Sequence, residues 1–357
     1  MTRLVLIGCG AVARRYYAPA LKALQLAGEM RVVGVVDSDP AAARAVRGML
    51  PESADYPDVS SIHRLGADLA IVATPPRYHA AHTKAALEAG LSVLCEKPMA
   101  TSIDEGRAMV DAAKAADRVL AVGFIRRFLP TTGAIHTLLR RGLLGEVTSV
   151  TGFEGDVFRW PVSSPDYFSP PEGGVLSDIG SHALDLLRWW MGDPEEIEYE
   201  DDATGGVEVN CRIRMKWAGG ATGMLRLSRD WARPNEYHIQ CTGGWIRWCV
   251  DSADTLQIGI ADGRYGFDAR IMDAAGDGNA RAATFEDGFA VQLRNVAAAH
   301  RGRAVPVVPG EEGLQNLRLI ERCRQQRKRM LMPWLSEAEW SGASRRAGGS
   351  VTGIREA

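Results

Sequence analysis

The stretch RLVLIGCGAVA (residues 3–13) decides the fold class of the first part of the chain. It begins with a short apolar run typical of a buried strand and continues into a turn that contains Gly8 and Gly10. Gly8 suits a tight turn, Gly10 leaves the backbone open to close approach, and Ala13 is small enough for a helix to pack on a strand. A strand, a glycine turn and a helix in this order predict the first unit of a parallel sheet.

Apolar runs and amphipathic helical patterns alternate through the first third of the chain. This alternation predicts a doubly wound parallel sheet with helices on both faces. The expected strands are residues 3–8, 31–37, 68–74, 91–96 and 118–124, and the expected helices are residues 11–27, 40–49, 77–89 and 103–117.

The pattern changes near residue 124. Strand-like runs joined by short glycine-containing turns predict an open, mostly antiparallel sheet; they cover residues 207–217, 222–231, 236–243, 244–250 and 255–260. Helices are expected over residues 131–141, 175–191, 285–301 and 311–329. The chain is therefore predicted to be α/β, with an N-terminal Rossmann domain over residues 1–123 and a C-terminal α+β domain over 124–330. Its tail, residues 331–357, is expected to be partly disordered because it is rich in Gly, Ser and charge.

Composition and charge exclude several classes of protein. A length of 357 residues predicts two domains, and a net charge of −2 with no long basic run disfavours nucleic acid as a partner. No apolar stretch is long enough to span a membrane, and the N-terminus runs directly into a strand without a secretory signal, so we expect a cytoplasmic protein. The six cysteines are scattered, which indicates neither a zinc site nor a disulfide framework.

The glycine turn is a candidate dinucleotide site. The helix that follows it begins near Ala11 and Val12, and the free N–H groups of a helix N-terminus attract phosphates. Asp37 ends the second expected strand, where a carboxylate would bind the adenine ribose hydroxyls. No Arg stands in the next three positions to meet a 2′-phosphate, which favours NAD over NADP. The alternative is a glycine-rich turn without a ligand.

Two further turns follow expected strands, at the sheet edge where ligands bind in such folds. ATPPRYH (residues 73–79) offers Thr74, Pro75 and His79 as cofactor contacts, and CEKPM (residues 95–99) offers Glu96 and Lys97.

Lys97 precedes a proline that restricts its backbone and so aims its side chain. A partly buried lysine exchanges protons near neutrality, or stabilises an alkoxide while it stays charged. The alternative is an ordinary surface lysine in a loop.

The segment GGVLSDIGSHALDLLRWW (residues 173–190) reads as a helix with Asp178, His182 and Asp185 in one narrow stripe beside an apolar arc. A first interpretation is an Asp–His pair that satisfies itself. A second is metal binding, which we disfavour because no further Cys or His completes a ligand set. A third is acid–base chemistry, with His182 taking the proton of a substrate hydroxyl and Asp178 orienting the substrate. Asp185 is expected to orient or cap structure.

Five motifs, taken in chain order, resemble the glucose-fructose oxidoreductase / inositol dehydrogenase / rhizopine catabolism (Gfo/Idh/MocA) family. They are GCGAVA, ATPPRYH, EKP, VGFIRRF and the G-G-x-x-x-D-x-x-x-H pattern of the helix at 173–190; residues 289–328 also resemble the end of the family, and the resemblance covers residues 2–330. It implies that Lys97, Asp178 and His182 converge beneath a nicotinamide, and that the outer sheet face forms a homodimer or homotetramer. Two loops depart from the family, with Ile125 and Pro76 where Asn is common.

Other substrate contacts are expected in two places. Arg127 follows the last strand of the first sheet and would reach substrate or form a surface ion pair. Arg159, Trp160 and Tyr167 lie in the loop before the helix at 173–190 and would line a sugar pocket or pack the loop on the sheet.

Together these features predict an NAD(P)-dependent oxidoreductase acting on a secondary alcohol of a sugar, sugar derivative or cyclitol, without a metal. His182 is the expected acid/base, Lys97 assists it, and Asp178 positions the substrate. A glycosidase or epimerase that retains NAD and oxidises its substrate transiently would share these residues. A redox-silent sugar or nucleotide sensor is less favoured, because both Lys97 and His182 are present.

Overall fold

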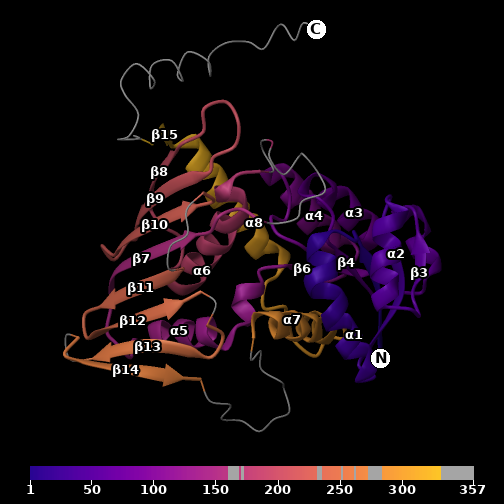
Figure 1. Cartoon of the computed structure of the whole chain (residues 1–357), viewed down its shortest axis with the longest axis horizontal. Helices are drawn as coiled ribbons and strands as arrows, with labels where there is room; N and C mark the ends of the chain where they lie inside the picture. Colours follow the sequence, from indigo (N-terminus) through magenta and orange to yellow (C-terminus); the bar gives the residue numbers. More distant parts are fainter. Residues whose placement is uncertain are drawn as a thin grey trace, which may run out of the picture.

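The computed structural model describes residues 1–159, 169, 173–230, 235–250, 252–260, 263–271 and 284–330. The expected tail, Trp160 and Tyr167 lie outside these residues. The chain forms two sheets with helices between and around them (Figure 1).

The first sheet has six parallel strands in the order β3-β2-β1-β4-β5-β6. Side chains alternate along β1, so that Leu4 and Leu6 enter one core and Val5 and Ile7 enter the other. The order reverses between β1 and β4, which opens a crevice at the carboxyl ends of these strands. The strands are β1 (Thr2–Ile7), β2 (Met30–Val36), β3 (Ala54–Tyr56), β4 (Leu69–Val72), β5 (Ser92–Cys95) and β6 (Leu120–Val122).

Helices cover both faces of this sheet (Figure 1). They are α1 (Ala18–Leu26), α2 (Pro40–Met49), α3 (Pro76–Glu88) and α4 (Ile103–Ala115), with a π-helical turn η1 (Ala13–Tyr17) before α1 and a 3₁₀ helix η2 (Val59–Arg64) after β3.

The second sheet has nine strands in the order β14-β13-β12-β11-β7-β10-β9-β8-β15. Only the pairs β7–β10 and β8–β15 are parallel among the pairs in the described residues, so the sheet is mostly antiparallel. The strands are β7 (Val147–Gly155), β8 (Glu196–Asp201), β9 (Asn210–Lys216), β10 (Thr222–Ser228), β11 (Glu236–Cys241), β12 (Gly244–Cys249), β13 (Thr255–Ile260), β14 (Tyr265–Arg270) and β15 (Arg327–Arg329).

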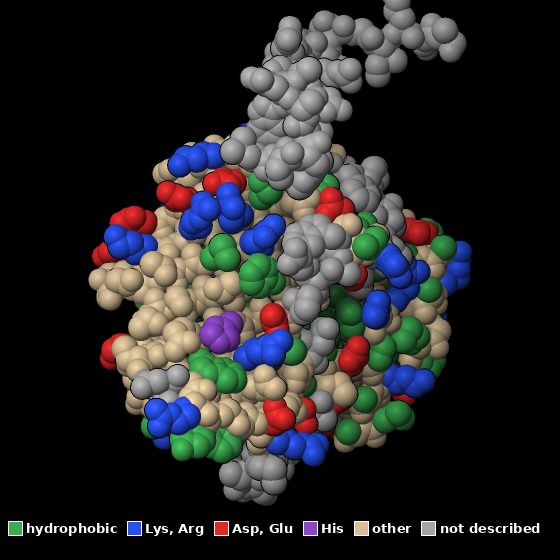
Figure 2. Space-filling view, turned by 60° about the vertical axis from the view of Figure 1, so that its left-hand side comes forward, with side chains coloured by type: hydrophobic (Ala, Val, Ile, Leu, Met, Phe, Trp, Pro, Cys, Tyr) green, Lys and Arg blue, Asp and Glu red, His purple; other side chains and the backbone are tan. Residues whose placement is uncertain are grey.

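One face of the second sheet packs on a 3₁₀ helix and several α-helices, and it looks toward the first sheet (Figure 1). These elements are η3 (Ile125–Phe128), α5 (Pro130–Arg140), a π-helical turn η5 (Leu176–Gly180) and α6 (Ser181–Met191). Cross-strand ion pairs cover part of the other face, where Arg212, Arg214 and Lys216 of β9 meet the glutamates of β8. Figure 2 shows side chains of both charges gathered at that end of the sheet.

The last two helices return to the first sheet. Tyr16 stacks on Phe289 of α7 (Phe285–His300) with ring centroids 4.8 Å apart, and Leu314 and Leu317 of α8 (Gly310–Gln325) enter the same core as α4. Both helices therefore tie the second half of the chain to the first. The domain boundary near residue 124 stays a prediction.

The predicted fold class is confirmed, with local differences. The expected helix at 311–329 ends at Gln325, and residues 327–329 form β15, because the Arg327 side chain bonds to both carboxylate oxygens of Asp201 at the end of β8. β3, β7, β8 and β14 were not anticipated. All six cysteines are free, and five of them are buried. No helix in the described part of the chain is long and apolar enough to cross a membrane.

Candidate active site

The glycine turn after β1 has the geometry that a dinucleotide needs. Gly8 has φ +95°, and a Cβ atom there would lie 2.6 Å from the carbonyl carbon and oxygen of Ala73, so this position accepts only glycine. Around Gly10 no atom lies within 4 Å of where a Cβ would be, so the backbone is open on that side. The helix begins at Ala11 and Val12 directly beside this opening.

Asp37 follows β2 and faces the same turn. Its Oδ2 accepts a hydrogen bond from the Cys9 N–H (2.7 Å), and its Oδ1 accepts one from the Asp39 N–H (2.8 Å). The carboxylate is thus fixed beside the turn, where it would meet the hydroxyls of an adenine ribose.

His79 is placed differently from the expected cofactor contact. Its ring is 1% exposed, with Nε2 2.7 Å from the Thr74 carbonyl oxygen and Nδ1 2.9 Å from the Pro98 carbonyl oxygen. Burial lowers the pKa of His79 to about 4. His79 therefore joins the turn after β4 to the turn after β5 from inside the protein. Thr74 remains beside Gly8, and Pro75 precedes the first residue of α3.

Lys97 follows β5 and reaches across to the helix of the second sheet. Its Nζ donates to Asp178 Oδ1 (2.7 Å) and to the Asp178 carbonyl oxygen (3.3 Å), and the two side chains are 16% and 20% exposed. Burial lowers the pKa of Lys97 to about 8; Glu96 opposes this shift, whereas Arg229 and Arg126 add to it.

His182 lies one turn beyond Asp178, and its ring meets Phe124 edge to face at 6.1 Å. Burial lowers the pKa of His182 well below its usual value, and the charges of Lys97 and Arg126 lower it further. The ring is therefore neutral near pH 7 and able to accept a proton. Its Nδ1 is buried, with no hydrogen-bond partner among the described residues.

The helix that carries Asp178 begins with the π-helical turn η5 and continues as α6, and Asp178 and Asp185 face different partners. Asp178 meets Lys97, whereas Asp185 is 2% exposed and points inward to Arg127. Glu208 holds the start of this turn, because its Oε1 accepts from the Leu176 N–H at 2.9 Å.

Arg127 has a structural partnership in place of the expected substrate contact. Its side chain is 3% exposed; it forms two bonds with Asp185 (2.9 and 2.7 Å) and one with Glu312 of α8 (2.7 Å). The guanidinium also lies over the Trp189 ring, 5.3 Å from its centroid. The ion pair expected as the alternative is present, but it is buried and does not lie at the surface. We therefore leave Arg127 out of the proposed substrate contacts.

Glu96 also faces the interior. It is 8% exposed, and it accepts hydrogen bonds from the Tyr17 hydroxyl (2.6 Å) and the Lys97 N–H (3.0 Å). Tyr17 is the last residue of the π-helical turn η1, and its side chain is fully buried. Glu96 thus contacts the backbone of Lys97, whose side chain reaches Asp178.

Two arginines near Lys97 were missed in the sequence. Arg126, the first arginine of VGFIRRF, makes two bonds to Glu154 (2.7 and 2.6 Å), which also accepts from the Tyr237 hydroxyl. Arg229, just after β10, forms an ion pair with the second oxygen of Asp178. The double arginine of the motif was a usable signal for Arg126, whereas nothing in the sequence near Arg229 marks it.

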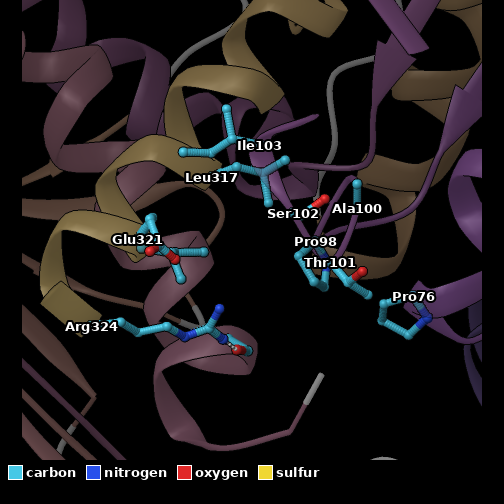
Figure 3. A pocket seen from close by; sticks show the side chains of 11 residues that line it. Pro76, Pro98, Ala100, Thr101, Ser102, Ile103, Leu317, Glu321 and Arg324 are labelled. Carbon is cyan, nitrogen blue, oxygen red and sulfur yellow. Dashed lines mark hydrogen bonds between the residues drawn. The ribbon is translucent and has the colours of Figure 1, made fainter. Parts of the chain in front are cut away.

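A small hollow lies behind the Lys97 turn, between that turn and α8 (Figure 3). Pro98, Thr101 and Ser102 line one side, and Glu321 and Arg324 line the other, with Arg324 donating to Ser177 Oγ at 2.8 Å. Its volume of about 20 Å³ suits a water molecule and is too small for a sugar.

Two further expectations concern the substrate contacts Arg159 and Trp160, and metal binding. Arg159 is exposed at the end of the segment that follows β7, and Trp160 lies beyond the described residues. Across the described ranges, no three His, Cys, Asp or Glu side chains are grouped to hold a metal ion.

Comparison with known proteins gives two family matches and many relatives. Residues 2–124 match the oxidoreductase family with an NAD-binding Rossmann fold (Gfo/Idh/MocA), and residues 133–247 match the Gfo/Idh/MocA C-terminal domain. Inositol 2-dehydrogenase of Rhizobium meliloti is 30% identical over 273 residues, which is 73% of this chain and 79% of that protein. D-xylose 1-dehydrogenase (NADP(+)) 2 of Haloferax volcanii is 27% identical over 88% of this chain and 94% of that protein.

Solved structures show the same fold. Levoglucosan dehydrogenase, in complex with NADH and levoglucosan, superposes with a TM-score of 0.78 at 21% identity, over 91% of this chain and 96% of that one.

Proposed function

The chain belongs to the Gfo/Idh/MocA family of oxidoreductases, and on this premise we propose that it interconverts a secondary alcohol and a ketone on a sugar, sugar derivative or cyclitol. The observation that carries the proposal is the contact between Lys97 Nζ and Asp178 Oδ1 at 2.7 Å. It joins the ligand edge of the first sheet to the helix that bears His182, so a hydroxyl held there would meet an ammonium and a neutral imidazole together.

In the proposed reaction His182, Lys97 and Asp178 have different tasks. The neutral His182 ring accepts the proton of the substrate hydroxyl as the carbon is oxidised, and returns it in the reverse direction. The Lys97 ammonium donates a hydrogen bond to the same oxygen and stabilises its developing negative charge. Asp178 holds the ammonium in place and orients the substrate. A bound nicotinamide dinucleotide supplies hydride transfer.

The test is dinucleotide reduction followed by absorbance, with inositols, aldoses, uronic acids, sugar phosphates and nucleotide sugars as substrates. Lys97→Ala and His182→Ala are expected to lose activity by about 10²–10⁴-fold, the usual contribution of a positioned acid–base group. Lys114→Ala and His63→Ala, both at exposed positions, serve as matched controls and should keep it. Turnover that survives in both site variants would refute the assignment.

The same assay separates the other candidate functions. Substrate consumption without net NADH, dependent on bound NAD⁺, would favour a glycosidase or epimerase that oxidises its substrate transiently. Tight binding of sugar and dinucleotide without any turnover would favour a redox-silent sensor.

For the cofactor we propose NAD rather than NADP. The fixed carboxylate of Asp37 would accept bonds from ribose hydroxyls and repel a 2′-phosphate. Asp37→Ser is expected to weaken NADH binding by about tenfold or more, which is the value of a hydrogen bond to a charged group. The variant should also reduce the preference in affinity for NADH over NADPH. Fluorescence titration of both cofactors measures this, with the exposed Asp104→Ser as the control. An unchanged ratio of the NADH and NADPH dissociation constants would contradict the role given to Asp37.

For assembly we propose a homodimer or homotetramer that forms through the outer face of the second sheet. Arg214→Glu places like charges beside Glu198 and Glu200 on that face and should weaken self-association. Sedimentation velocity measures the assembly, and a monomeric native protein would refute this proposal.

A further inference from the structure

Asn316 contacts the helix that bears His182. It lies in α8 and is 1% exposed. Its Nδ2 donates to the Ser181 carbonyl oxygen at 2.8 Å. That carbonyl belongs to the peptide bond between Ser181 and His182, so the Asn316 amide lies directly against the backbone of the proposed acid/base. The Ser181 hydroxyl in turn donates to the Asp178 carbonyl oxygen at 2.8 Å, which also accepts from Lys97.

Asn316 and His182 each have one buried atom without a hydrogen-bond partner in the described part of the chain. These atoms are Asn316 Oδ1 and His182 Nδ1. An amide oxygen only accepts hydrogen bonds, whereas Nδ1 of a neutral imidazole donates one when it carries the proton. An unpaired buried polar atom costs stability, and native proteins keep few of them. The two atoms are complementary, and they belong to side chains that meet at the same peptide bond.

The charged groups that face His182 do not supply an acceptor for Nδ1. Lys97 and Arg126 lie near enough to lower the pKa of His182, and both side chains carry only donors. Asp178, one turn earlier in the helix, accepts from Lys97 at 2.7 Å and forms no bond with the His182 ring. Asn316 Oδ1 is therefore the acceptor that suits Nδ1 among these groups.

We propose that Asn316 is a positioning residue that sets the tautomer of His182, and this inference rests on the proposed function. Its Nδ2 holds the peptide bond between Ser181 and His182, and its Oδ1 accepts a hydrogen bond from Nδ1–H of the ring once the dinucleotide is bound. Catalytic hydrogen bonds are often long or poorly aligned until such a complex forms. With the proton held on Nδ1, the lone pair of Nε2 is left to accept the proton of the substrate hydroxyl.

A rival role for Asn316 is only to hold α8 against α6. Arg188 of α6 bonds to Glu312 of α8 at 2.8 Å, so the two helices are also joined at a second place. Loss of the Asn316 amide should therefore leave the helices packed. The two roles differ in one measurable quantity, which is the nitrogen of the neutral His182 ring that carries the proton.

The experiment measures the tautomer of His182 by NMR. Protein labelled with nitrogen-15 histidine is saturated with the reduced dinucleotide near neutral pH, and long-range proton–nitrogen correlation spectra distinguish protonated from unprotonated ring nitrogens. The signals of His182 are those missing from His182→Gln. The same spectra are recorded for Asn316→Leu and for the control Asn295→Leu. Asn295 lies in α7, where its amide bonds to the Val305 carbonyl oxygen (3.3 Å) and the Val307 N–H (2.9 Å), so the control also removes an asparagine that holds backbone.

We expect the proton on Nδ1 of His182 in the native protein and in Asn295→Leu. In Asn316→Leu the proton should move at least partly to Nε2, because its acceptor is gone. With the substrates of the dehydrogenase assay, kcat of Asn316→Leu should fall by about tenfold, the value of one neutral hydrogen bond, while KM stays within about threefold. A proton on Nε2 in the native protein, or an unchanged tautomer in Asn316→Leu, would overturn the inference; melting temperatures confirm that each variant is folded.

Failure of this inference and failure of the proposed function can be told apart. Turnover that is lost in His182→Ala but retained in Asn316→Leu, with an unchanged tautomer, overturns the role of Asn316 and leaves the reaction intact. A tautomer that depends on Asn316, without turnover of any compound, overturns the reaction and leaves the positioning of the ring.

Discussion

Replacing Arg127 with methionine tests whether this arginine supports the fold or the substrate. The change keeps most of the apolar stem and removes the guanidinium from the buried carboxylate of Asp185, which is 2% exposed. Glu312 keeps a bond from Arg188 at 2.8 Å, so the loss falls mainly on Asp185. We expect a clear loss of stability with little effect on substrate affinity.

The size of the effect follows from burial. Removing one partner of a buried ion pair costs about 3–5 kcal/mol, because the other charge is left without compensation. On the scale of roughly 2–4 °C per kcal/mol for large domains, the melting temperature of Arg127→Met should fall by about 10 °C. Arg188→Met should cost less, since Arg188 is 16% exposed and its partner Asp193 is 58% exposed.

A lower pH should reduce the loss of stability that Arg127→Met causes. Burial raises the pKa of Asp185 above its ordinary value even in the native protein, and Arg127 opposes this rise. Without the arginine the folded-state pKa of Asp185 rises further, so the folded variant binds a proton that the unfolded chain does not. The stability that this proton contributes to the folded variant is therefore lost as pH rises through that pKa. The deficit of Arg127→Met should be smaller at pH 5 than at pH 8.

Urea unfolding at both pH values and substrate KM complete the assay. The double variant Arg127→Met/Asp185→Leu removes both charges and should recover most of the loss. KM should change by less than about threefold in the folded single variant, which fits removal of a group that makes no substrate contact. Unchanged stability together with a tenfold rise in KM would refute the reasoning and return Arg127 to the substrate site.

Two further changes probe the cofactor turn and the groups behind Lys97. Gly8→Ala should abolish NADH binding, measured by fluorescence, because its Cβ would lie 2.6 Å from backbone atoms; Gly28→Ala, which has φ +70° but open space, should keep it. Tyr17→Phe removes a bond that favours the ionised form of Glu96, so the pKa of Glu96 rises and that of Lys97 falls below about 8. The alkaline limb of the kcat–pH profile should then move to lower pH. Glu96→Gln should produce the same shift, and the double variant Tyr17→Phe/Glu96→Gln should shift the limb no further than either single variant does. Superimposable profiles would contradict this link.

Local sequence signals placed the first sheet and its helices well. Helix α2 begins and ends at the predicted residues, because Asp39 accepts a bond from the Ala41 N–H at 2.8 Å and Pro40 occupies the first turn. Strands β1, β4 and β5 are buried on both faces, so their apolar runs are continuous and easy to see.

The second sheet carried weaker signals. β15 is three basic residues with no apolar alternation, and its pairing with β8 depends on the distant Asp201. β14 has exposed side chains almost throughout, so it lacks the pattern of a half-buried strand. Such strands are defined by tertiary partners, which a local pattern does not contain.

The candidate site divides in the same way. Short motifs identified Gly8, Lys97 and His182, because the residue types that define each motif lie within a few positions of one another in the sequence. Arg229 became visible only when Asp178, 51 positions earlier in the chain, was placed beside it. The inward position of Asp185 depends on its buried partner Arg127, 58 positions earlier in the chain, which the local helical pattern does not contain.

The protonation state of Lys97 depends on both halves of the chain. Burial alone favours the neutral amine, and Glu96 of the first sheet restores part of the preference for the ammonium. Arg126 and Arg229 reach Lys97 from the side of the second sheet and lower its pKa again. The resulting pKa, about 8, lies near neutrality only while the two halves are packed together. Separation of the halves would hydrate Lys97 and take it away from both arginines, so its pKa would return toward that of an ordinary lysine. Proton exchange at Lys97 near neutral pH therefore requires the docked arrangement of the two halves.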